Sequence, residues 1–588
     1  MEFNLHNIIN LELAKEVEKS IHKVFSHAEV DLTAIYKMLS PPPKSDMGEL
    51  AFPCFSLSKA LKKAPNIISQ ELSEEINSRA SQMGLFKNCK SFGPYINFFL
   101  NEKTVNKLVI ESVISEDLFK QNLSLNAPKT IVEYSQPNTH KVMHVGHMRN
   151  LCLGNAIVNL YKYAGVETLS TTFPGDVGTH VAKCLWYMKK HSNEEVPLTR
   201  KGEWLGGHYV RGNSLLEEQK GTPQEEINRS ELTQILKELH AGSGEYYELW
   251  KQTRQWSLEL MQEVYDWAEV HFDSWYWESD VDADSVALVQ EYLSKGLFIK
   301  DNGAVGIDLK EDKLGFCLLL KSDGTGLYAT KDLELARRKF IDQKVEQSLY
   351  VVDNRQSLHF KQVFKTLEKM GFENAKNCLH LQYEMVELKD GAMSSRKGNI
   401  VPIQTLIEEM NSMIKDSYLN KYQGEWSTEE IERTAHIVAS GAIKYGMTRV
   451  DSNKKIIFEI NDWLKLDGES GPYIQYVHAR IKSMLTKVGE GIPPDYSVLD
   501  HPLEKEMINK ISLFNQTVEH CVDHNKTHPL CSYLYDLSKS YNSFYAECSV
   551  LKAENDNLKY ARADLSKSVA LCLKHGLKLL GITAPEKM

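Results

Sequence analysis

The fold of this chain is decided by one stretch, Pro137-Asn138-Thr139-His140-Lys141-Val142-Met143-His144-Val145-Gly146-His147. A β-branched and apolar run over residues 130–134 precedes it, and an apolar-periodic segment over residues 143–164 follows it and stops at Gly165. Glycine is favoured just past the end of a helix, so the pattern predicts a strand, a loop and a helix. A helix N-terminus presents unpaired backbone N–H groups and the positive end of the helix dipole, which suit a phosphate. We therefore expect an ATP site at this turn.

Two histidines strengthen that expectation. His144 and His147 lie three residues apart, on one face of the first helical turn, and their ring nitrogens can donate to phosphate oxygens. Gly146 between them has no side chain and lets a flat ring approach the backbone. With 20 His and 33 Gly in the chain, a chance His-x-Gly-His is expected about 0.04 times. The strand before it and the helix after it favour a functional interpretation.

Length and composition describe a globular protein of several domains. The chain has 588 residues, 42% of them hydrophobic and 25% charged, and single cores stop growing near about 250 to 300 residues. Its ten cysteines include no Cys-x-x-Cys pair, so neither a zinc site nor a disulfide framework is indicated. We therefore expect the protein to be located in a reducing cytoplasm. The chain contains no run of 18 apolar residues, so we expect no membrane span. The net charge of −10 argues mildly against nucleic acid as a partner, although local patches decide that question.

The chain divides into three predicted domains. Residues 1–125 combine helical patterns with a strand-like run over residues 95–100, which predicts an α+β module. Strand and helix patterns alternate over residues 126–410, which predicts a parallel sheet with crossover helices, interrupted by an insertion around residues 189–243. Helical patterns dominate residues 411–588, which predicts an all-α domain.

Particular turns carry polar residues. The segment Gly175-Asp176-Val177-Gly178 follows a predicted strand and could hold a ribose or simply turn a corner. Thr330 is predicted to cap a helix that begins between Tyr328 and Asp332, and Ser427 opens a capping box. Two carboxylates and a tyrosine near one ATP site indicate a cationic substrate, because a carboxylate matches a guanidinium bidentately. They are Glu278, Asp332 and Tyr328, joined by Gln356 and His359 after the strand over residues 348–352.

Residues 136–147 resemble the HIGH signature of class I aminoacyl-tRNA synthetases, and most closely that of the arginyl enzymes. A second segment, Ala392-Met393-Ser394-Ser395-Arg396-Lys397-Gly398-Asn399, resembles the KMSKS loop of the same class. Both consensus lysine positions of that loop are replaced here, by Ala392 and Ser395. Arginyl enzymes that lack the second loop lysine carry one just upstream of HIGH, and Lys141 occupies that place.

The resemblance covers nearly the whole chain and implies roles for particular residues. It implies a Rossmann-type catalytic domain, an N-terminal domain that binds the D-arm of tRNA and a helical anticodon-binding domain. The implied catalytic residues are His144, His147 and Lys141, and the implied ATP contacts are Gly146, Asp176, Gly178, Met393, Ser394, Ser395, Arg396 and Lys397. The implied arginine contacts are Gln136, Asn138, His147, Glu278, Tyr328, Asp332 and Gln356. The implied tRNA contacts are Tyr95, Asn97, Tyr473, Tyr476, Tyr545 and Met588.

The expected reaction joins arginine to tRNA at the expense of ATP, with Mg²⁺ accompanying ATP and with no structural metal. We expect a monomer, and the family's habit implies that activation requires bound tRNA. Two other interpretations stay open. A metabolite nucleotidylyltransferase can share the His-x-Gly-His turn, but the helical C-terminal domain and the KMSKS-like loop count against it. A non-catalytic paralogue that binds tRNA or a partner is favoured only by the missing loop lysines.

Overall fold

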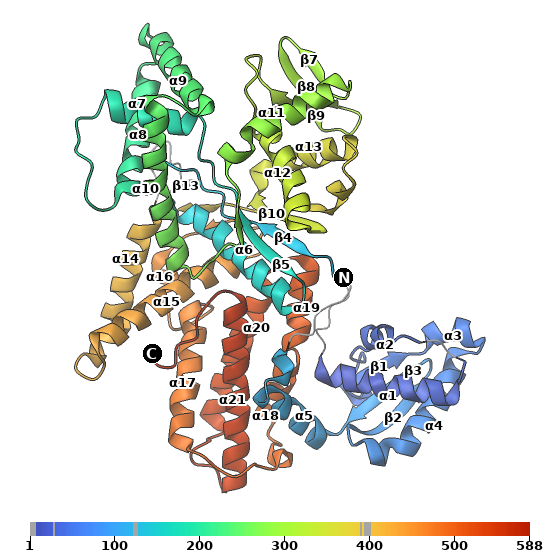
Figure 1. Cartoon of the computed structure of the whole chain (residues 1–588). Coiled ribbons are helices and arrows are strands. Elements are labelled where there is room, and N and C mark those ends of the chain that lie inside the picture. The colour runs from blue at the N-terminus through green and yellow to red at the C-terminus, as the bar shows by residue number, and fades with distance from the viewer. Residues whose placement is uncertain (1–6, 28–29, 121–126, 389–390, 393–400) are drawn as a thin grey trace.

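The computed structural model describes residues 7–27, 30–120, 127–388, 391–392 and 401–588. A parallel sheet of five strands lies at its centre, in the order β11-β10-β4-β5-β6 (Figure 1). The chain winds outward from β4 to one edge and then builds the other half, which is the doubly wound order. The predicted Rossmann-type sheet is therefore confirmed. The strands are β4 (Thr130–Glu133), β5 (Thr168–Thr172), β6 (Ser274–Trp275), β10 (Gln347–Asp353) and β11 (Cys378–Tyr383).

The predicted strand, loop and helix at the start of this sheet are confirmed. All four residues of β4 are buried, as expected of a strand that parallel neighbours and helices enclose on both sides. Helix α6 (Val145–Tyr163) follows and is buried along most of its length, so it forms part of the core. Gly165 ends the segment with a φ of +81°, in the left-handed region that glycine favours.

Four helices between β5 and β6 contain the predicted insertion (Figure 1). Helix α8 packs closely against the loop that precedes α6, because a Cβ at Gly206 would come within 2.3 Å of the Val142 side chain. A glycine inside the helix therefore lets this loop lie against the helix backbone. The helices are α7 (Thr179–Lys190), α8 (Lys201–Glu218), α9 (Gln224–Ala241) and α10 (Glu245–Trp267).

The connection from β6 to β10 corrects one prediction. Helix α12 begins at Tyr328 with Leu327 at the N-cap position, so Thr330 lies inside the first turn and does not cap the helix. Its buried hydroxyl instead donates to the Leu319 carbonyl, at 2.5 Å. The elements here are α11 (Glu278–Ser294), β7 (Ile299–Asp301), β8 (Ala304–Leu309), β9 (Gly315–Leu320), α12 (Tyr328–Gln343) and, after β10, α13 (Ser357–Lys369).

The N-terminal module is α+β, as predicted. Three antiparallel strands in the order β1-β3-β2 pack against helices, and α5 (Glu102–Ile114) joins the module to the rest of the chain (Figure 1). Its elements are α1 (Ile8–Val24), α2 (Leu32–Met38), β1 (Leu50–Pro53), α3 (Phe55–Leu61), α4 (Pro65–Met83), β2 (Phe86–Phe92) and β3 (Tyr95–Leu100).

The C-terminal part is a helical domain, as predicted, and it packs against α6 within one continuous hydrophobic core. Ser427 caps α15 as predicted, because its hydroxyl accepts the Glu430 N–H at 3.2 Å. Among the described helices, none is both long enough and apolar enough to cross a membrane. The elements are β12 (Val386–Leu388), β13 (Gly391–Ala392), α14 (Ile403–Ile414), α15 (Thr428–Thr448), β14 (Ile456–Ile457), α16 (Ile460–Trp463), α17 (Gly471–Val488), α18 (Pro502–Ser512), α19 (Phe514–His524), α20 (His528–Glu547) and α21 (Asp556–Leu579). The domain boundaries at 125 and 410 stay predictions.

Candidate active site

One cavity of about 400 Å³ opens at the carboxyl ends of β4 and β10. These strands are neighbours at the point where the strand order reverses, which is where doubly wound sheets bind ligands. All the residues predicted to hold the amino acid line this cavity, although they come from distant parts of the chain. They are Gln136, Asn138, His147, Glu278, Tyr328, Asp332 and Gln356.

Two carboxylates face the cavity from the first turns of α11 and α12. Burial raises the pKa of Glu278 to about 7, and Lys331, whose Nζ lies 3.3 Å from Oε2, only partly offsets that rise. The Asp332 carboxylate lies 2.5 Å from Nε2 of His359. Burial opposes protonation of His359, but the hydrogen bond with Asp332 outweighs it and raises the pKa of the imidazole. Both carboxylates therefore already have cationic or hydrogen-bonding partners within the protein.

A glycine lets the two loops at the cavity edge meet. The Thr139 N–H donates to the Gly175 carbonyl at 2.9 Å, and the Gly175 N–H donates to the Pro137 carbonyl at 3.1 Å. A Cβ at Gly175 would lie 2.4 Å from Oδ1 of Asn138 and 3.5 Å from the carboxyl carbon of Glu278. Because position 175 is glycine, the Asn138 and Glu278 side chains can both approach the backbone where a Cβ would otherwise stand.

A polar network orients the Gln136 side chain. Its amide donates to Oε1 of Glu133 at 3.1 Å, and its carbonyl accepts from Asn150 at 3.2 Å. The other Glu133 oxygen is paired with Lys339, which is wholly buried. Asn150 also donates to the hydroxyl of Tyr383, at 3.1 Å. Since both of its ends are bonded to the protein, Gln136 is oriented before any ligand arrives.

The two signature histidines orient each other. Nδ1 of His144 accepts the Gly146 N–H, and Nδ1 of His147 accepts the His144 N–H, each at 3.1 Å. Burial lowers the pKa of His144 to about 4 and that of His147 well below its usual range, with further lowering from the Lys141 charge. Both rings are therefore neutral. Because each Nδ1 is an acceptor, each ring carries its proton on Nε2 and can donate one hydrogen bond.

The helix N-terminus differs from the prediction. We expected unpaired backbone N–H groups to meet a phosphate, but all those of the first turn have partners. The Val145 N–H donates to the Val401 carbonyl, at 3.1 Å, and the His147 N–H to the His144 carbonyl, at 2.8 Å. The Gly146 N–H is taken by the His144 ring. The donors available to an anion at this turn are thus the histidine Nε2 atoms rather than the backbone of Gly146.

Lys141 lies on a loop that the insertion helices support. Its Nζ is 4.8 Å from the ring centroid of Tyr209 on α8. The preceding residue, His140, is wholly buried with a φ of +60°, and its ring bonds Thr253 of α10 at 2.8 Å. The His140 N–H also donates to Ser257, one turn further along α10, at 2.9 Å. This anchoring compensates the strained backbone and fixes the loop that carries Lys141.

Asp176 and Gly178, from the segment Gly175–Gly178, have structural roles in this geometry. Asp176 is wholly buried and does not line the cavity, because its carboxylate is bonded to Arg254 and Ser279. Gly178 has a φ of +116° and occupies the N-cap position of α7. Their predicted contacts with ATP stay predictions, and the geometry favours a corner that joins elements over a ribose site.

The second signature, Met393, Ser394, Ser395, Arg396 and Lys397, lies outside the described residues. The chain that follows it is placed beside the histidine turn. Pro402 forms a β-bridge with His144, and the Ile403 N–H donates to the Met143 carbonyl at 3.1 Å. Residues 402 and 403, which follow the second signature in the sequence, are thus adjacent in space to the first one.

Comparison with known proteins identifies the family. The profile described as "tRNA synthetases class I (R), catalytic domain" matches residues 109–460, "DALR anticodon binding domain" matches residues 474–588, and "Arginyl tRNA synthetase N terminal domain" matches residues 11–100. The arginine–tRNA ligase of Bdellovibrio bacteriovorus is 52% identical over 585 residues, which is 99% of this chain and 100% of that protein. The chain belongs to the arginyl-tRNA synthetase family.

Other relatives agree with this assignment over the same length. The arginine–tRNA ligase of Clostridium perfringens is 33% identical and aligns with 96% of this chain and 98% of its own. The solved structure of the Thermus thermophilus arginyl-tRNA synthetase superposes with a TM-score of 0.77 at 26% identity, covering 98% of this chain and 99% of that one. The similarity therefore includes both terminal domains as well as the catalytic one.

The two residues of the N-terminal module that are predicted to contact tRNA differ in exposure. Tyr95 is 41% exposed and packs edge-to-face against Phe55, which is also exposed. Asn97 is buried, and its amide donates to the Met47 carbonyl at 2.9 Å. Tyr95 is therefore available for stacking on a base, whereas Asn97 braces the loop beneath it. The predicted contact of Asn97 with tRNA has no support in this geometry.

Three of the predicted anticodon contacts lie on neighbouring helices of the DALR domain. Tyr473 and Tyr476 lie on α17 and Tyr545 on α20. Asn542 donates to the Tyr473 hydroxyl at 2.9 Å, and the Arg480 guanidinium lies 4.2 Å from the ring centroid of Tyr545. Together they make an aromatic surface with a cation beside it, which suits single-stranded RNA.

The fourth predicted contact, Met588, ends a tail that packs on the same domain. Its carbonyl accepts from the Tyr422 hydroxyl at 3.4 Å. Earlier in the tail, the Pro585 carbonyl lies 2.9 Å from Nδ1 of His478 on α17. The tail is therefore held against the helix that carries Tyr473.

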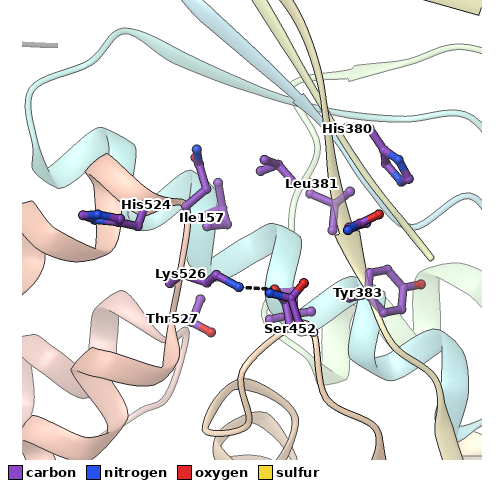
Figure 2. Close-up of a pocket in the computed structure, with 13 residues that line it drawn as sticks. Ile157, His380, Leu381, Tyr383, Ser452, His524, Lys526 and Thr527 are labelled. Carbon is purple, nitrogen blue, oxygen red and sulfur yellow. Dashed lines mark hydrogen bonds between the residues drawn. The ribbon is translucent and has the colours of Figure 1, made fainter. Parts of the chain in front are cut away.

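A second cavity, of about 170 Å³, lies where the catalytic domain meets the helical domain (Figure 2). His380, Leu381 and Tyr383 of β11 form one wall. On the opposite side Lys526 donates to the Ser452 hydroxyl at 2.8 Å, shown by the dashed line in Figure 2. Tyr383 lines both cavities.

Sequence reasoning missed some residues that line the main cavity. Glu133 ends β4 and could have been found from the rule that ligands bind at the carboxyl ends of strands. Asn150 follows His147 by one helical turn and could have been found from that spacing. Tyr383 carries no local signal, because only the completed sheet brings β11 next to β10.

Proposed function

We propose that this arginyl-tRNA synthetase family member uses the cavity between β4 and β10 to activate L-arginine with ATP and to transfer it to the 3′ end of tRNA. In the first step an oxygen of the arginine carboxylate attacks the α-phosphorus of ATP, and the bond to pyrophosphate breaks. In the second step a ribose hydroxyl of the terminal tRNA nucleotide attacks the arginyl carbonyl, loses its proton and displaces AMP. The observation that carries the proposal is the convergence of the predicted arginine contacts on one cavity.

The guanidinium would lie between α11 and α12. Glu278 and Asp332 offer carboxylates there, and the exposed Tyr328 also lines the cavity. A carboxylate accepts two parallel N–H donors from a guanidinium, which an ammonium cannot supply in the same plane. Asparagine, glutamine or citrulline would bring no positive charge to these carboxylates. The geometry therefore supports selection of arginine by charge and by shape.

The amino acid's own backbone would be held at the other side of the cavity. Gln136, Asn138 and Gln356 present amides there, and His147 presents a ring nitrogen. His144, His147 and Lys141 would stabilise charge that develops on the phosphates. Most of the barrier is then lowered by positioning and electrostatics, since the protein forms no covalent bond in this reaction.

We propose that ATP, Mg²⁺ and tRNA are the further participants. The described residues contain no group of three or more His, Cys, Asp or Glu that could hold a metal ion, so Mg²⁺ would be held largely by phosphate oxygens. When bound, it neutralises phosphate charge. The contacts of ATP with Gly146 and with residues 393–397, the monomeric state and the cytoplasmic location remain predictions.

Exchange of labelled pyrophosphate into ATP tests the proposal. Each amino acid is supplied in turn, with and without tRNA. Arginine is the only amino acid with which we expect exchange. Exchange with a different amino acid would contradict the assignment of the cavity. No exchange with any amino acid, with tRNA present, would favour the non-catalytic paralogue.

A further inference from the structure

The N-terminus of α11 is capped from outside its own sequence. Trp277 occupies the N-cap position and has no side chain that can accept the first helical N–H groups. The Asp176 carboxylate does so from the β5–α7 loop, because Oδ1 accepts the Ser279 N–H at 2.9 Å and Oδ2 accepts the Ser279 hydroxyl at 2.7 Å. A carboxylate at a helix N-terminus also interacts favourably with the helix dipole. Asp176 thus fixes the start of the helix on which Glu278 is the first residue.

Arg254 on α10 holds that carboxylate in turn. Its Nε donates to Oδ2 of Asp176 at 2.7 Å, and its guanidinium lies 4.1 Å from the ring centroid of Trp277. Trp250, one turn earlier on α10, donates from its indole to the Asp176 carbonyl at 2.7 Å. Asp176 is wholly buried, so without Arg254 its charge would have no cation beside it.

The same face of α10 also anchors the loop before the histidine turn. Trp250, Thr253, Arg254 and Ser257 recur at the spacing of one helix face. Thr253 and Ser257 bond His140, while Trp250 and Arg254 bond Asp176. Helix α10, which follows the insertion, therefore supports both loops of the cavity edge.

We propose that Arg254 and Asp176 are positioning residues for arginine recognition, which they set by fixing the start of α11 and with it the Glu278 carboxylate. The inference rests on the proposed function, since it concerns how the same cavity selects its amino acid. Neither side chain lines the cavity. Their effect is therefore on the affinity for arginine and not on the affinity for ATP.

The test separates these two affinities in pyrophosphate exchange. Arg254→Met, Arg254→Lys and Asp176→Asn are compared with the full-length parent enzyme. We expect the KM for arginine to rise about tenfold or more in Arg254→Met and Asp176→Asn, with the KM for ATP changed less than about twofold. Arg254→Lys should lie between, because an ammonium keeps the charge but not the planar geometry. Arg229→Gln is the control, since Arg229 is an exposed residue of α9 that pairs only with Glu225 and Glu226 on the same helix.

A second measurement distinguishes positioning from general loosening. If Arg254 acts through Glu278, adding Arg254→Met to Glu278→Gln should raise the KM for arginine by less than about twofold further. If the two substitutions instead raise the KM for arginine independently, so that their effects multiply, the proposal is overturned. A rise in the KM for ATP in Asp176→Asn would also overturn it, because Asp176 would then be a nucleotide contact.

Three further outcomes are informative. If Arg254→Met does not fold, Arg254→Lys and Ser279→Ala are used instead, and an unchanged KM for arginine in both would overturn the proposal. A parent enzyme that shows no exchange with arginine would overturn the proposed function and this inference together. A parent that is active with arginine, but whose variants keep its KM, would overturn the inference alone.

Discussion

The candidate active site holds its polar groups by different means at its two proposed ends, the arginine end and the phosphate end. At the arginine end the groups are charged and each has a partner in the protein: Glu278 with Lys331, and Asp332 with His359. At the phosphate end the two histidine rings are neutral. The His144 ring accepts the Gly146 N–H, and the His147 ring accepts the His144 N–H. An arginine that enters therefore exchanges partners with carboxylates that are already compensated, which avoids leaving a buried charge unpaired. An anion instead meets the neutral donors of the histidines and the positive charge of Lys141.

The largest expected effect breaks the arginine end alone. Asp332→Asn should abolish arginine binding while ATP binding is largely kept, because loss of a charge-assisted pair in a closed pocket costs on the order of 2 to 5 kcal/mol. Calorimetric titration with arginine and then with ATP measures both. Asp342→Asn, an exposed position on the same helix, is the matched control. Unchanged arginine affinity in Asp332→Asn would remove this residue from the site.

The next effect breaks the phosphate end alone. Lys141→Ala should slow adenylate formation about tenfold to a hundredfold with little change in arginine affinity, because its charge is needed more in the transition state than in the ground state. Single-turnover activation measures the rate, and Lys220→Ala, on the exposed end of the insertion, serves as control. A Lys141→Ala enzyme as fast as the parent would make Lys141 a loop residue that only packs on Tyr209.

A third effect uses pH to separate the ends. Glu278 has a pKa of about 7, so below that pH its carboxyl is neutral and cannot attract a guanidinium. Arginine affinity should therefore fall by up to about tenfold for each pH unit below this value and level off above it. Calorimetry in buffers of different ionisation enthalpy should show proton release on binding. Lys331, Asp176 and Asp332 are the charged groups that act on Glu278.

Another titratable group of the cavity, His359, provides the counter-test. His359 has a raised pKa because of its hydrogen bond with Asp332. In Glu278→Gln the pH dependence should disappear along with much of the affinity. A Glu278→Gln enzyme that keeps the whole pH dependence would assign it to His359 instead.

The smallest expected effect comes from a region remote from both ends. Deleting residues 586–588 removes the Lys482–Glu586 and Lys587–Glu430 ion pairs at the edge of the predicted anticodon surface. Exposed pairs contribute little to stability, so the fold should survive. We expect tRNA binding and tRNA-dependent activation to weaken together, by roughly threefold to tenfold, because tRNA would favour the competent state of the catalytic domain. Full-rate exchange without any tRNA would refute that coupling and leave the ligase assignment standing.

Sequence reasoning predicted the parts of this site that depend on local patterns. The strand over residues 130–134, the helix after it and its end at Gly165 follow from periodicity and from the left-handed preference of glycine. The carboxyl-end rule correctly selected Gln356, because the position of a strand end relative to a ligand is set by the sheet topology.

Contacts between distant segments could not be predicted from the sequence. Asp176 could be a nucleotide contact or a structural residue, and only the placement of α10 brings Arg254 to it. Thr330 has the chemistry of a cap, but the Leu319 carbonyl of β9 takes its hydroxyl. The Gly146 N–H is satisfied by the His144 ring and the Val145 N–H by the Val401 carbonyl, and neither bond can be predicted from the local sequence alone.

The most direct test of the account is aminoacylation of tRNA in a mixture of all amino acids. The purified protein is incubated with ATP, Mg²⁺ and a tRNA bearing an arginine anticodon, and the ester on the 3′ nucleotide is identified by mass. The account predicts an arginyl ester, with one AMP and one pyrophosphate released for each ester formed. A lysyl or other ester, or no ester while tRNA is still bound, would contradict it.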